Sequence, residues 1–457
     1  MRAGSNAFGS NSGAVRARVF SGEEMSERAK LIFANAKGEI FDHPFLEMMG
    51  SEGDTVTEVP AGDLVPIPEG TKLFTMPGRL PVGWDPTACR KVVLDRVEWQ
   101  GESFVPQAVS GFLPPGFART FLPATAMAND APRLPLWAYA ALGWKGGKFY
   151  GAGVRVDETP HWDPENYDDR TLQPLVKKRL ADSENRLLHH LERCAMEYHC
   201  LAAKNLFYGR WECPLPVSPV CNADCVGCIS LQTDGKVPAS HERLNFLPAA
   251  GEILEIAVPH LESAEEAVVS FGQGCEGEPL LQAELIEEVI LEIRRQTKRG
   301  VIHINTNGSR PELVEKLCRA GLDSMRTSMN SAQTNYYQAY YRPKDYTLAE
   351  VEKSVKIASD YSVFTSVNLL TFPGFTDRRQ EQDSFLEFVK ATRLCMVQWK
   401  NLNIDPDLYR KLIGPATESV MGIRRAIGEV RERFPGLLTG YFNRPNHVIE
   451  SVRQTRL

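Results

Sequence analysis

The spacing of apolar and polar positions changes several times along the chain, and these changes divide it into segments. Between residues 29 and 170, short apolar runs broken by Gly and Pro, as in DLVPIPEGTKLFTMPGRLPVGWD, predict the hairpins of a β-rich accessory domain. Residues 171–212 carry leucines among charges at helical intervals, which predicts a helical bridge. Residues 1–28 are rich in Gly, Ser and Asn and show little periodicity, so we expect a flexible N-terminal arm.

Between residues 213 and 410, strand-like apolar runs alternate with amphipathic helix-like segments, as in βα units on a parallel sheet. Six strands with five intervening helices predict an α/β fold whose core is a partial (β/α)6 barrel. The reactive site of such a barrel lies at the C-terminal ends of its strands. Residues 411–457 are expected to add a C-terminal helical extension, with a helix over about 416–434. The predicted strands are Leu215–Val220, Ala267–Phe271, Val301–Asn305, Ser324–Met329, Val363–Leu370 and Cys395–Trp399.

The composition narrows the class of protein. A length of 457 residues exceeds what one hydrophobic core usually organises, and 43% hydrophobic with 24% charged residues exclude a disordered or fibrous chain. A formal net charge of −6 disfavours nucleic-acid binding through bulk electrostatics, although a local basic groove stays open. Because no apolar run is long enough to cross a bilayer and the N-terminus lacks the apolar centre of a signal peptide, we expect a cytoplasmic protein without a membrane partner.

Three of the ten cysteines form the strongest chemical signal. Cys221, Cys225 and Cys228 have the spacing CX3CX2C and lie in the loop after the first predicted barrel strand. Three thiolates on a [4Fe–4S] cluster leave one of its four irons open to an external ligand. The alternative is a structural zinc site, which would need a fourth ligand such as His241 or Cys213.

This triplet, in its position after strand one of a partial barrel, resembles the cluster motif of the radical S-adenosylmethionine (SAM) superfamily, and the resemblance covers residues 213–401. It implies that the amino and carboxylate groups of SAM chelate the open iron. One electron from the cluster then gives methionine and a 5′-deoxyadenosyl radical, which abstracts hydrogen from a substrate. One residue departs from the family pattern: Gly227 stands where an aromatic residue is common, so adenine contact is expected from elsewhere, for instance from Ile229.

A second match follows the second predicted strand. Gly277-Glu278-Pro279 resembles the Gly-Gly-Glu element of the superfamily, in which a flexible backbone and a carboxylate hold the ammonium group of SAM. The alternative interpretation is a glycine-rich turn between a strand and a helix, capped by Glu278.

Polar residues near the ends of later strands supply further candidate SAM ligands. Arg326, Ser328 and Asn330 alternate along and beyond the fourth strand and therefore share one face. By resemblance, polar groups at the end of this strand bind the ribose and carboxylate of SAM. Helix capping and turn formation are the alternatives. The further candidates are Asn307, Asn368 and Gln398.

Of the seven cysteines outside the triplet, four are the main candidates for further chemistry. Cys275 lies between the glycines after strand two and Glu278, where it could quench a radical intermediate, ligate a second cofactor or simply be a buried thiol. A second cluster on Cys194, Cys200 and Cys213 requires a broken helix or a fourth ligand such as Cys89, because Cys194 and Cys200 do not share a face of one continuous helix.

These features predict a radical SAM enzyme whose N-terminal domain covers the barrel mouth or recruits a substrate. A glycyl-radical activase, an iron–sulfur electron carrier and a zinc-structural protein are the alternatives. The resemblance implies a reductant such as flavodoxin or ferredoxin. No motif names the substrate, which we expect to be a small molecule or a peptide rather than a nucleic acid.

Overall fold

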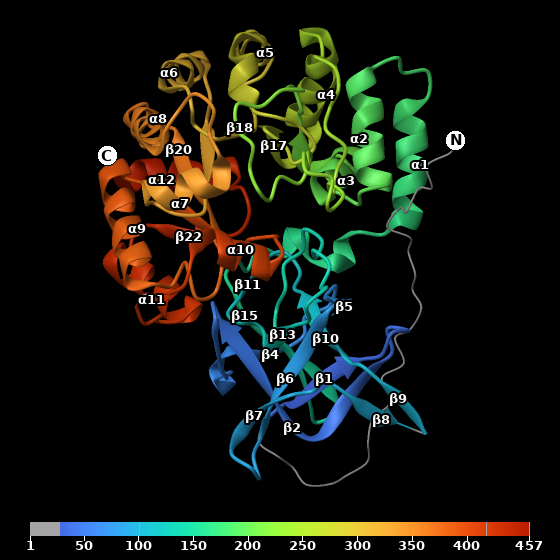
Figure 1. Cartoon of the computed structure of the whole chain (residues 1–457). Coiled ribbons are helices and arrows are strands. Elements are labelled where there is room, and N and C mark those ends of the chain that lie inside the picture. Colours follow the sequence, from blue (N-terminus) through green and yellow to red (C-terminus); the bar gives the residue numbers. More distant parts are fainter. Residues whose placement is uncertain (1–27, 100, 417, 457) are drawn as a thin grey trace.

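Three regions follow one another along the chain in Figure 1: strands up to residue 155, three helices, and then alternating strands and helices. The structure is a computed structural model that describes residues 28–99, 101–416 and 418–456. The arm predicted for residues 1–28 therefore lies, except for Arg28, outside the described residues. No helix in these ranges combines the length and the apolar character needed to cross a bilayer.

The first region is a largely antiparallel β-structure. Its main sheet has 13 strands in the described part of the chain, with the central order β11-β15-β14-β1-β2-β6-β13. Alternating apolar side chains of β1, β2, β10 and β14 fill its interior, as the hairpin pattern requires. The strands are β1 (Lys30–Ala34), β2 (Ile40–Glu52), β3 (Thr55–Glu58), β4 (Leu64–Pro66), β5 (Lys72–Met76), β6 (Arg79–Asp85), β7 (Arg90–Val93), β8 (Val97–Trp99), β9 (Glu102–Phe104), β10 (Gln107–Phe112), β11 (Phe117–Arg119), β12 (Leu122–Pro123), β13 (Thr125–Met127), β14 (Leu142–Lys145) and β15 (Lys148–Arg155).

Three helices connect this sheet to the next region: α1 (Asp169–Leu180), α2 (Arg186–Met196) and α3 (Leu201–Tyr208). The Asn185 side chain caps α2 by accepting a hydrogen bond from Leu188 N. The chain breaks between α2 and α3, where His199 adopts a φ of 52°. A second metal site that includes both Cys194 and Cys200 was expected to require such a break in the helix.

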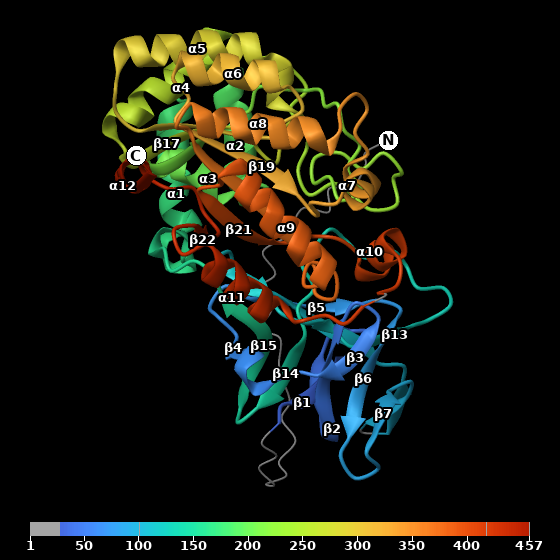
Figure 2. The ribbon, with the colours of Figure 1, turned by 90° about the vertical axis from the view of Figure 1, so that its left-hand side faces the viewer.

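The last region is a curled parallel sheet with helices on its outer face (Figures 1 and 2). Seven described strands follow the order of the sequence, from β16 to β22. The elements are β16 (Arg210–Pro214), α4 (Ala250–Ser263), β17 (Glu265–Phe271), α5 (Ala283–Gln296), β18 (Val301–Thr306), α6 (Pro311–Ala320), β19 (Ser324–Met329), α7 (Thr334–Tyr341), α8 (Leu348–Asp360), β20 (Phe364–Thr371), α9 (Arg379–Thr392), β21 (Met396–Asn401), α10 (Pro406–Ile413), α11 (Ile423–Arg433), β22 (Leu438–Gly440) and α12 (Asn446–Arg456). The α/β partial-barrel class is therefore confirmed.

Two details of the predicted barrel need correction. The first strand is β16 rather than 215–220, because prolines at 214, 216 and 219 remove backbone donors and end the pairing with β17. A seventh short strand, β22, pairs in parallel with β21 and extends the predicted six. In addition, the helix expected over 416–434 is shorter, since α11 begins after Gly422.

The β-rich region packs against the C-terminal ends of β20 and β21 (Figure 1). Arg119 of β11 is fully buried and donates to the carbonyl of Leu402 at 2.8 Å. Asn401, the last residue of β21, accepts from Arg119 N at 2.8 Å and donates to the carbonyl of Phe117 at 2.9 Å. The accessory region therefore borders the edge of the sheet at which a barrel carries its site.

Candidate functional site

The cysteine triplet lies in a loop that is held from behind by the end of α7. Val226 N donates to the carbonyl of Tyr340 at 2.9 Å, and Asp224 N to that of Tyr341 at 3.2 Å. Lys344 N in turn donates to the carbonyl of Asn222 at 3.0 Å. These backbone bonds fix the loop before any ligand is considered.

The three thiols are half-buried and lie close enough to influence one another. Burial raises the pKa of Cys225 well above its ordinary value, and repulsion from Cys228 and Cys221 adds to this rise. Burial also raises the pKa of Cys221. Three neighbouring thiolates therefore need positive charge beside them, which iron supplies in a cluster.

Arg243 is a functional candidate that the sequence analysis missed. Its Nη2 donates to Cys228 Sγ at 3.4 Å and its Nε to Ser230 Oγ at 3.1 Å. A hydrogen bond to a sulfur ligand is one of the means by which a protein tunes a metal centre. No spacing rule identified Arg243, since it is brought to Cys228 by the irregular loop between the triplet and α4.

The Gly277-Glu278 turn is joined to the segment that leads into the triplet. Gly277 N donates to the carbonyl of Ser218 at 2.7 Å, and Glu278 N to that of Val220 at 2.8 Å. A Cβ on residue 277 would stand 1.9 Å from the Val220 oxygen, so only glycine fits. Gly277 thus allows its backbone to approach the Val220 backbone, next to Cys221, rather than a ligand.

The Glu278 carboxylate is 4% exposed and binds three donors of the protein. Leu280 N donates to Oε1 at 3.0 Å, Asn307 N donates to Oε2 at 2.8 Å, and Thr306 Oγ1 donates to Oε1. Burial raises the pKa of Glu278 to about 7. Glu278 therefore caps the turn after β17, as the alternative interpretation described, and also ties that turn to the end of β18.

Asn307 belongs to the same framework. Its Nδ2 donates to Asn222 Oδ1 at 2.8 Å, and Asn222 Nδ2 donates to Ser309 Oγ at 3.0 Å and to Asp345 Oδ1 at 2.9 Å. Because Asn222 directly follows Cys221, this chain of amides orients the cysteine loop.

The departure at Gly227 has a physical cause in Tyr340. A Cβ on residue 227 would stand 2.6 Å from Tyr340 Oη and 3.3 Å from the carbonyl oxygen of Asn403. An aromatic residue at 227 would thus collide with a buried tyrosine that already fills this space. Ile229, the residue suggested for adenine contact, packs instead beside Gly274, where a Cβ would stand 2.6 Å from its Cδ1.

A row of polar side chains crosses the three neighbouring strands β19, β20 and β21. Ser328 of β19 is in register with Asn368 of β20, and Asn368 with Gln398 of β21. Arg326 lies two residues before Ser328 on the same face, and its Nη1 donates to Gln398 Oε1 at 2.6 Å. The sheet therefore brings together four of the residues that the alternation singled out.

Unpaired buried polar atoms gather around this row. Arg326 Nε, Asn330 Oδ1 and Asn368 Oδ1 have no hydrogen-bond partner among the described residues. Asn330 uses its Nδ2 to donate to Tyr409 Oη at 3.1 Å. A buried polar atom left unpaired costs about 1–3 kcal/mol, so this region fits a polar ligand that would pair with these atoms.

Lys400 follows Gln398 by two residues on β21 and therefore lies on the same face of the sheet. The sequence analysis did not name it, although the same alternation could have identified it. Its Nζ stands 3.4 Å from the centre of the Tyr441 ring. Burial, followed by repulsion from Arg326, lowers the pKa of Lys400 well below its ordinary value. Burial of this amine therefore disfavours its charged form.

Two of the remaining cysteines, Cys194 and Cys275, form a second group apart from the triplet. Cys275 is buried, and its side chain meets Cys194 of α2 rather than lying alone in the turn. His190 completes this second group, with Nε2 at 3.6 Å from Cys194 Sγ. Cys213 is fully buried in β16, and Cys89 is exposed in the β-rich region, where its Sγ meets the carbonyl of Pro86.

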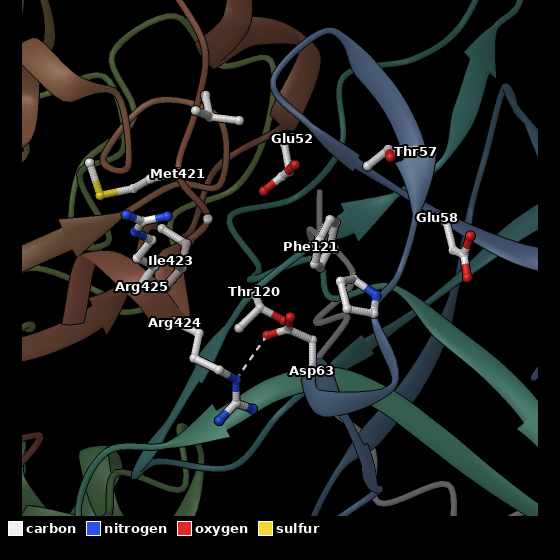
Figure 3. A pocket seen from close by; sticks show the side chains of 13 residues that line it. Glu52, Thr57, Glu58, Asp63, Thr120, Phe121, Met421, Ile423, Arg424 and Arg425 are labelled. Atoms are coloured by element: carbon white, nitrogen blue, oxygen red, sulfur yellow. Dashed lines mark hydrogen bonds and ion pairs between the residues drawn. The ribbon is translucent and has the colours of Figure 1, made fainter. Parts of the chain in front are cut away.

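A surface pocket lies elsewhere, between the β-rich region and the start of α11 (Figure 3). Glu52, Phe121 and Met421 line it, and Arg424 Nε donates to Asp63 Oδ1 at 3.2 Å. None of the ten cysteines is part of its described lining, so the pocket is distinct from the candidate site.

Comparison with known families agrees with this site. Residues 215–386 match the family model of the radical SAM superfamily. The chain thus carries a radical SAM domain over these residues and is an enzyme of the radical SAM class. Enzymes of this class use a [4Fe–4S] cluster and SAM. The three mutually repelling thiols and the unpaired polar atoms of β19 and β20 fit these two groups.

Solved structures similar to the chain include radical SAM enzymes. The FeFe-hydrogenase maturase HydG from Carboxydothermus hydrogenoformans is 13% identical over 63% of this chain and 68% of that chain, with a TM-score of 0.35. Methylornithine synthase (PylB) is 15% identical over 60% of this chain and 75% of that chain, with a TM-score of 0.36. A radical SAM methyltransferase from Sphaerobacter thermophilus is 13% identical over 50% of this chain and 63% of that chain, with a TM-score of 0.36. A comparison with curated proteins finds no match.

Proposed function

We propose that this chain binds a [4Fe–4S] cluster on Cys221, Cys225 and Cys228 and cleaves SAM reductively there. When bound, the cluster supplies one electron to SAM, which yields methionine and a 5′-deoxyadenosyl radical for hydrogen abstraction from a substrate. The observation that carries the proposal is the triplet loop at the C-terminal edge of a parallel sheet, held by backbone bonds to α7 and to the Gly277-Glu278 turn.

The residues around the triplet have two proposed roles, positioning of the cysteine loop and binding of SAM. Asn307, Gly277 and Glu278 position the loop, since their bonds run to Asn222, Ser218 and Val220 or to the end of β18. Arg326, Ser328, Asn330, Asn368 and Gln398 provide the polar face that receives SAM, which is supported by the three unpaired atoms on it.

Lys400 and Arg326 suggest that the substrate brings an acidic or polar group to the mouth of the sheet. Both basic side chains lie on the inner face, and Arg119 of the β-rich region is buried at the ends of β20 and β21. The proposed substrate is a small molecule or a peptide, and the proposed electron donor is a flavodoxin or ferredoxin.

The proposal is tested by anaerobic reconstitution with iron and sulfide, followed by iron counting and by measuring 5′-deoxyadenosine from SAM and dithionite. We expect about four irons per chain at the triplet and SAM-dependent 5′-deoxyadenosine. The variant with Cys221, Cys225 and Cys228 all changed to Ala serves as the matched control and should lose both signals. A fully loaded protein that forms no 5′-deoxyadenosine would instead be an electron carrier, and the proposal would be wrong.

A further inference from the structure

We infer that His190, Cys194 and Cys275 form a mononuclear zinc site that is separate from the cysteine triplet. The ligand atoms of these three side chains all lie within 4.8 Å of one another. They are the only such group of three His, Cys, Asp or Glu side chains within the described ranges of the chain. The chemistry of the group, one imidazole and two thiols, is the chemistry that zinc prefers in proteins.

Two secondary elements that are distant in sequence supply the ligands. His190 and Cys194 lie one turn apart on α2, so they share a face of that helix. Cys275 comes from the loop after β17, about eighty residues later in the sequence. Cys194 is 1% and Cys275 5% exposed, so the two sulfurs meet inside the protein, with His190 half-buried at their side.

The spacing fits one ion better than a cluster. His190 Nε2 lies 3.6 Å from Cys194 Sγ. Tetrahedral zinc, with Zn–S of about 2.3 Å and Zn–N of about 2.0–2.1 Å, holds its nitrogen and sulfur ligands about 3.5–3.6 Å apart. The thiolates of a [4Fe–4S] cluster bind different irons and must stand farther from one another than the ligands of one ion. The second cluster considered from the sequence is therefore replaced by a single metal ion.

Two further side chains interact electrostatically with the group and are candidates for the fourth position. Cys200 interacts with both Cys194 and Cys275, and its backbone N donates to the carbonyl of Cys194 at 2.9 Å across the break between α2 and α3. His241 interacts with His190, and its Nδ1 is buried without a partner among the described residues. Neither residue belongs to the group whose ligand atoms lie within 4.8 Å of one another, so either would have to move toward the ion to become the fourth ligand.

A metal in this position would fix the turn beside the triplet. Cys275 is followed by Glu276, whose carboxylate accepts from Val217 N at 2.7 Å and from Ser218 N at 2.8 Å. Ser230 Oγ donates to the Glu276 carbonyl at 3.1 Å and lies 3.6 Å from Cys228 Sγ. The zinc site would thus join α2 to the loop that supports the first and third cysteines.

The experiment measures zinc and iron together in the full chain by mass spectrometry, after loading with Zn²⁺ and anaerobic reconstitution of the cluster. We expect one zinc per chain in addition to the triplet's iron. His190→Ala and Cys194→Ala should each lower bound zinc at least fivefold, while most of the iron stays. Cys318→Ala removes a buried thiol of α6 outside the group and should retain zinc. Cys200→Ser and His241→Ala, measured in the same way, identify the fourth ligand.

The variant that lacks Cys221, Cys225 and Cys228 separates this inference from the proposed function. It should lose iron but keep zinc, and Co²⁺ loaded in place of Zn²⁺ should show thiolate-to-cobalt charge transfer that Cys194→Ala abolishes. Zinc retained in both His190→Ala and Cys194→Ala would overturn the inference. So would a wild-type chain that binds no zinc, a Cys194–Cys275 disulfide in the purified protein, or loss of iron in place of zinc from Cys194→Ala.

Discussion

At the scale of single residues, Gly227 departs from the family pattern for a steric reason. Tyr340 already fills the space that a side chain at 227 would enter, and it lies on the helix end that holds the triplet loop. The tyrosine ring therefore occupies the space that an aromatic side chain at 227 would need. The sequence spacing alone could not reveal this contact, since the two residues are brought together only by the fold.

We predict that Gly227→Ala weakens the loop and that Tyr340→Phe rescues it. The new Cβ would stand 2.6 Å from Tyr340 Oη, whereas the ring carbon behind that oxygen stands at 3.4 Å, an ordinary contact. Overpacking of this kind costs about 1–3 kcal/mol, so Gly227→Ala should lower both Tm and the iron retained after desalting. The double variant should recover most of both. A double variant no better than Gly227→Ala would show that Tyr340 is not the obstacle.

A second residue-scale prediction concerns the polar row. Asn368→Ala removes a buried amide oxygen that has no partner among the described residues and that we assign to SAM binding. One net hydrogen bond contributes about 0.5–1.5 kcal/mol, so the Kd for SAM should rise about 2- to 13-fold. Isothermal titration on the reconstituted protein measures this, and Asn446→Ala, at the exposed start of α12, is the control. An unchanged Kd would remove Asn368 from the SAM site.

At the scale of elements, hydrophobic periodicity was sufficient for β17 to β21, since each strand carries buried apolar residues, alternating with polar ones in β19, and stands between helices. It failed at β16, where prolines interrupt the pairing, and at β22, which has only three residues. The candidate site followed the same division. Polar residues on regular strands were predictable by alternation, but Arg243 was not, because an irregular loop brings it to Cys228. His190 and Cys194 share a face of α2, and only the loop after β17 brings Cys275 to them.

Glu381 of α9 allows an element-scale prediction about pH. Its carboxylate accepts from Ser331 Oγ at 2.6 Å and from Gln333, and so joins α9 to the loop after β19. Burial raises its pKa to about 7 from 4.5. The folded protein thus binds a proton that the unfolded chain releases between these values, and this group's contribution to stability falls as the pH rises from about 4.5 to 7, by up to about 3 kcal/mol.

Glu381→Gln should remove this part of the pH dependence. The free energy of unfolding, measured with denaturant at pH 5 and pH 8, should differ less between the two pH values in the variant than in the wild type. Glu387→Gln changes an exposed carboxylate of the same helix and should keep the wild-type difference. Equal pH dependence in the wild type and Glu381→Gln would contradict the prediction.

At the scale of the whole molecule, one buried ion pair joins the β-rich region to the parallel sheet. Arg79 of β6 donates from Nη2 to Asp405 Oδ2 and from Nε to Asp407 Oδ2, both at 3.0 Å, and the side chains of Arg79 and Asp405 are 2% and 4% exposed. Asp405 also accepts from Leu134 N at 2.8 Å and caps α10. Because α10 follows β21, this contact lies at the C-terminal edge of the sheet. The ion pair therefore holds the accessory region against that edge.

We predict that Asp405→Ala lowers the free energy of unfolding by about 3–5 kcal/mol. The substitution leaves the buried Arg79 charge with Asp407 as its remaining acidic partner and removes the cap of α10. Asp405→Asn keeps an oxygen for the cap but not the charge, so it should fall between Asp405→Ala and the wild type. Asp383→Asn, which breaks an exposed pair with Arg379, should change stability by less than about 1 kcal/mol. If the two regions are coupled at this edge, Asp405→Asn should also raise the KM for SAM while its cluster content stays unchanged. A stability loss without any change in KM would mean that the ion pair only holds the two regions together and does not shape the mouth.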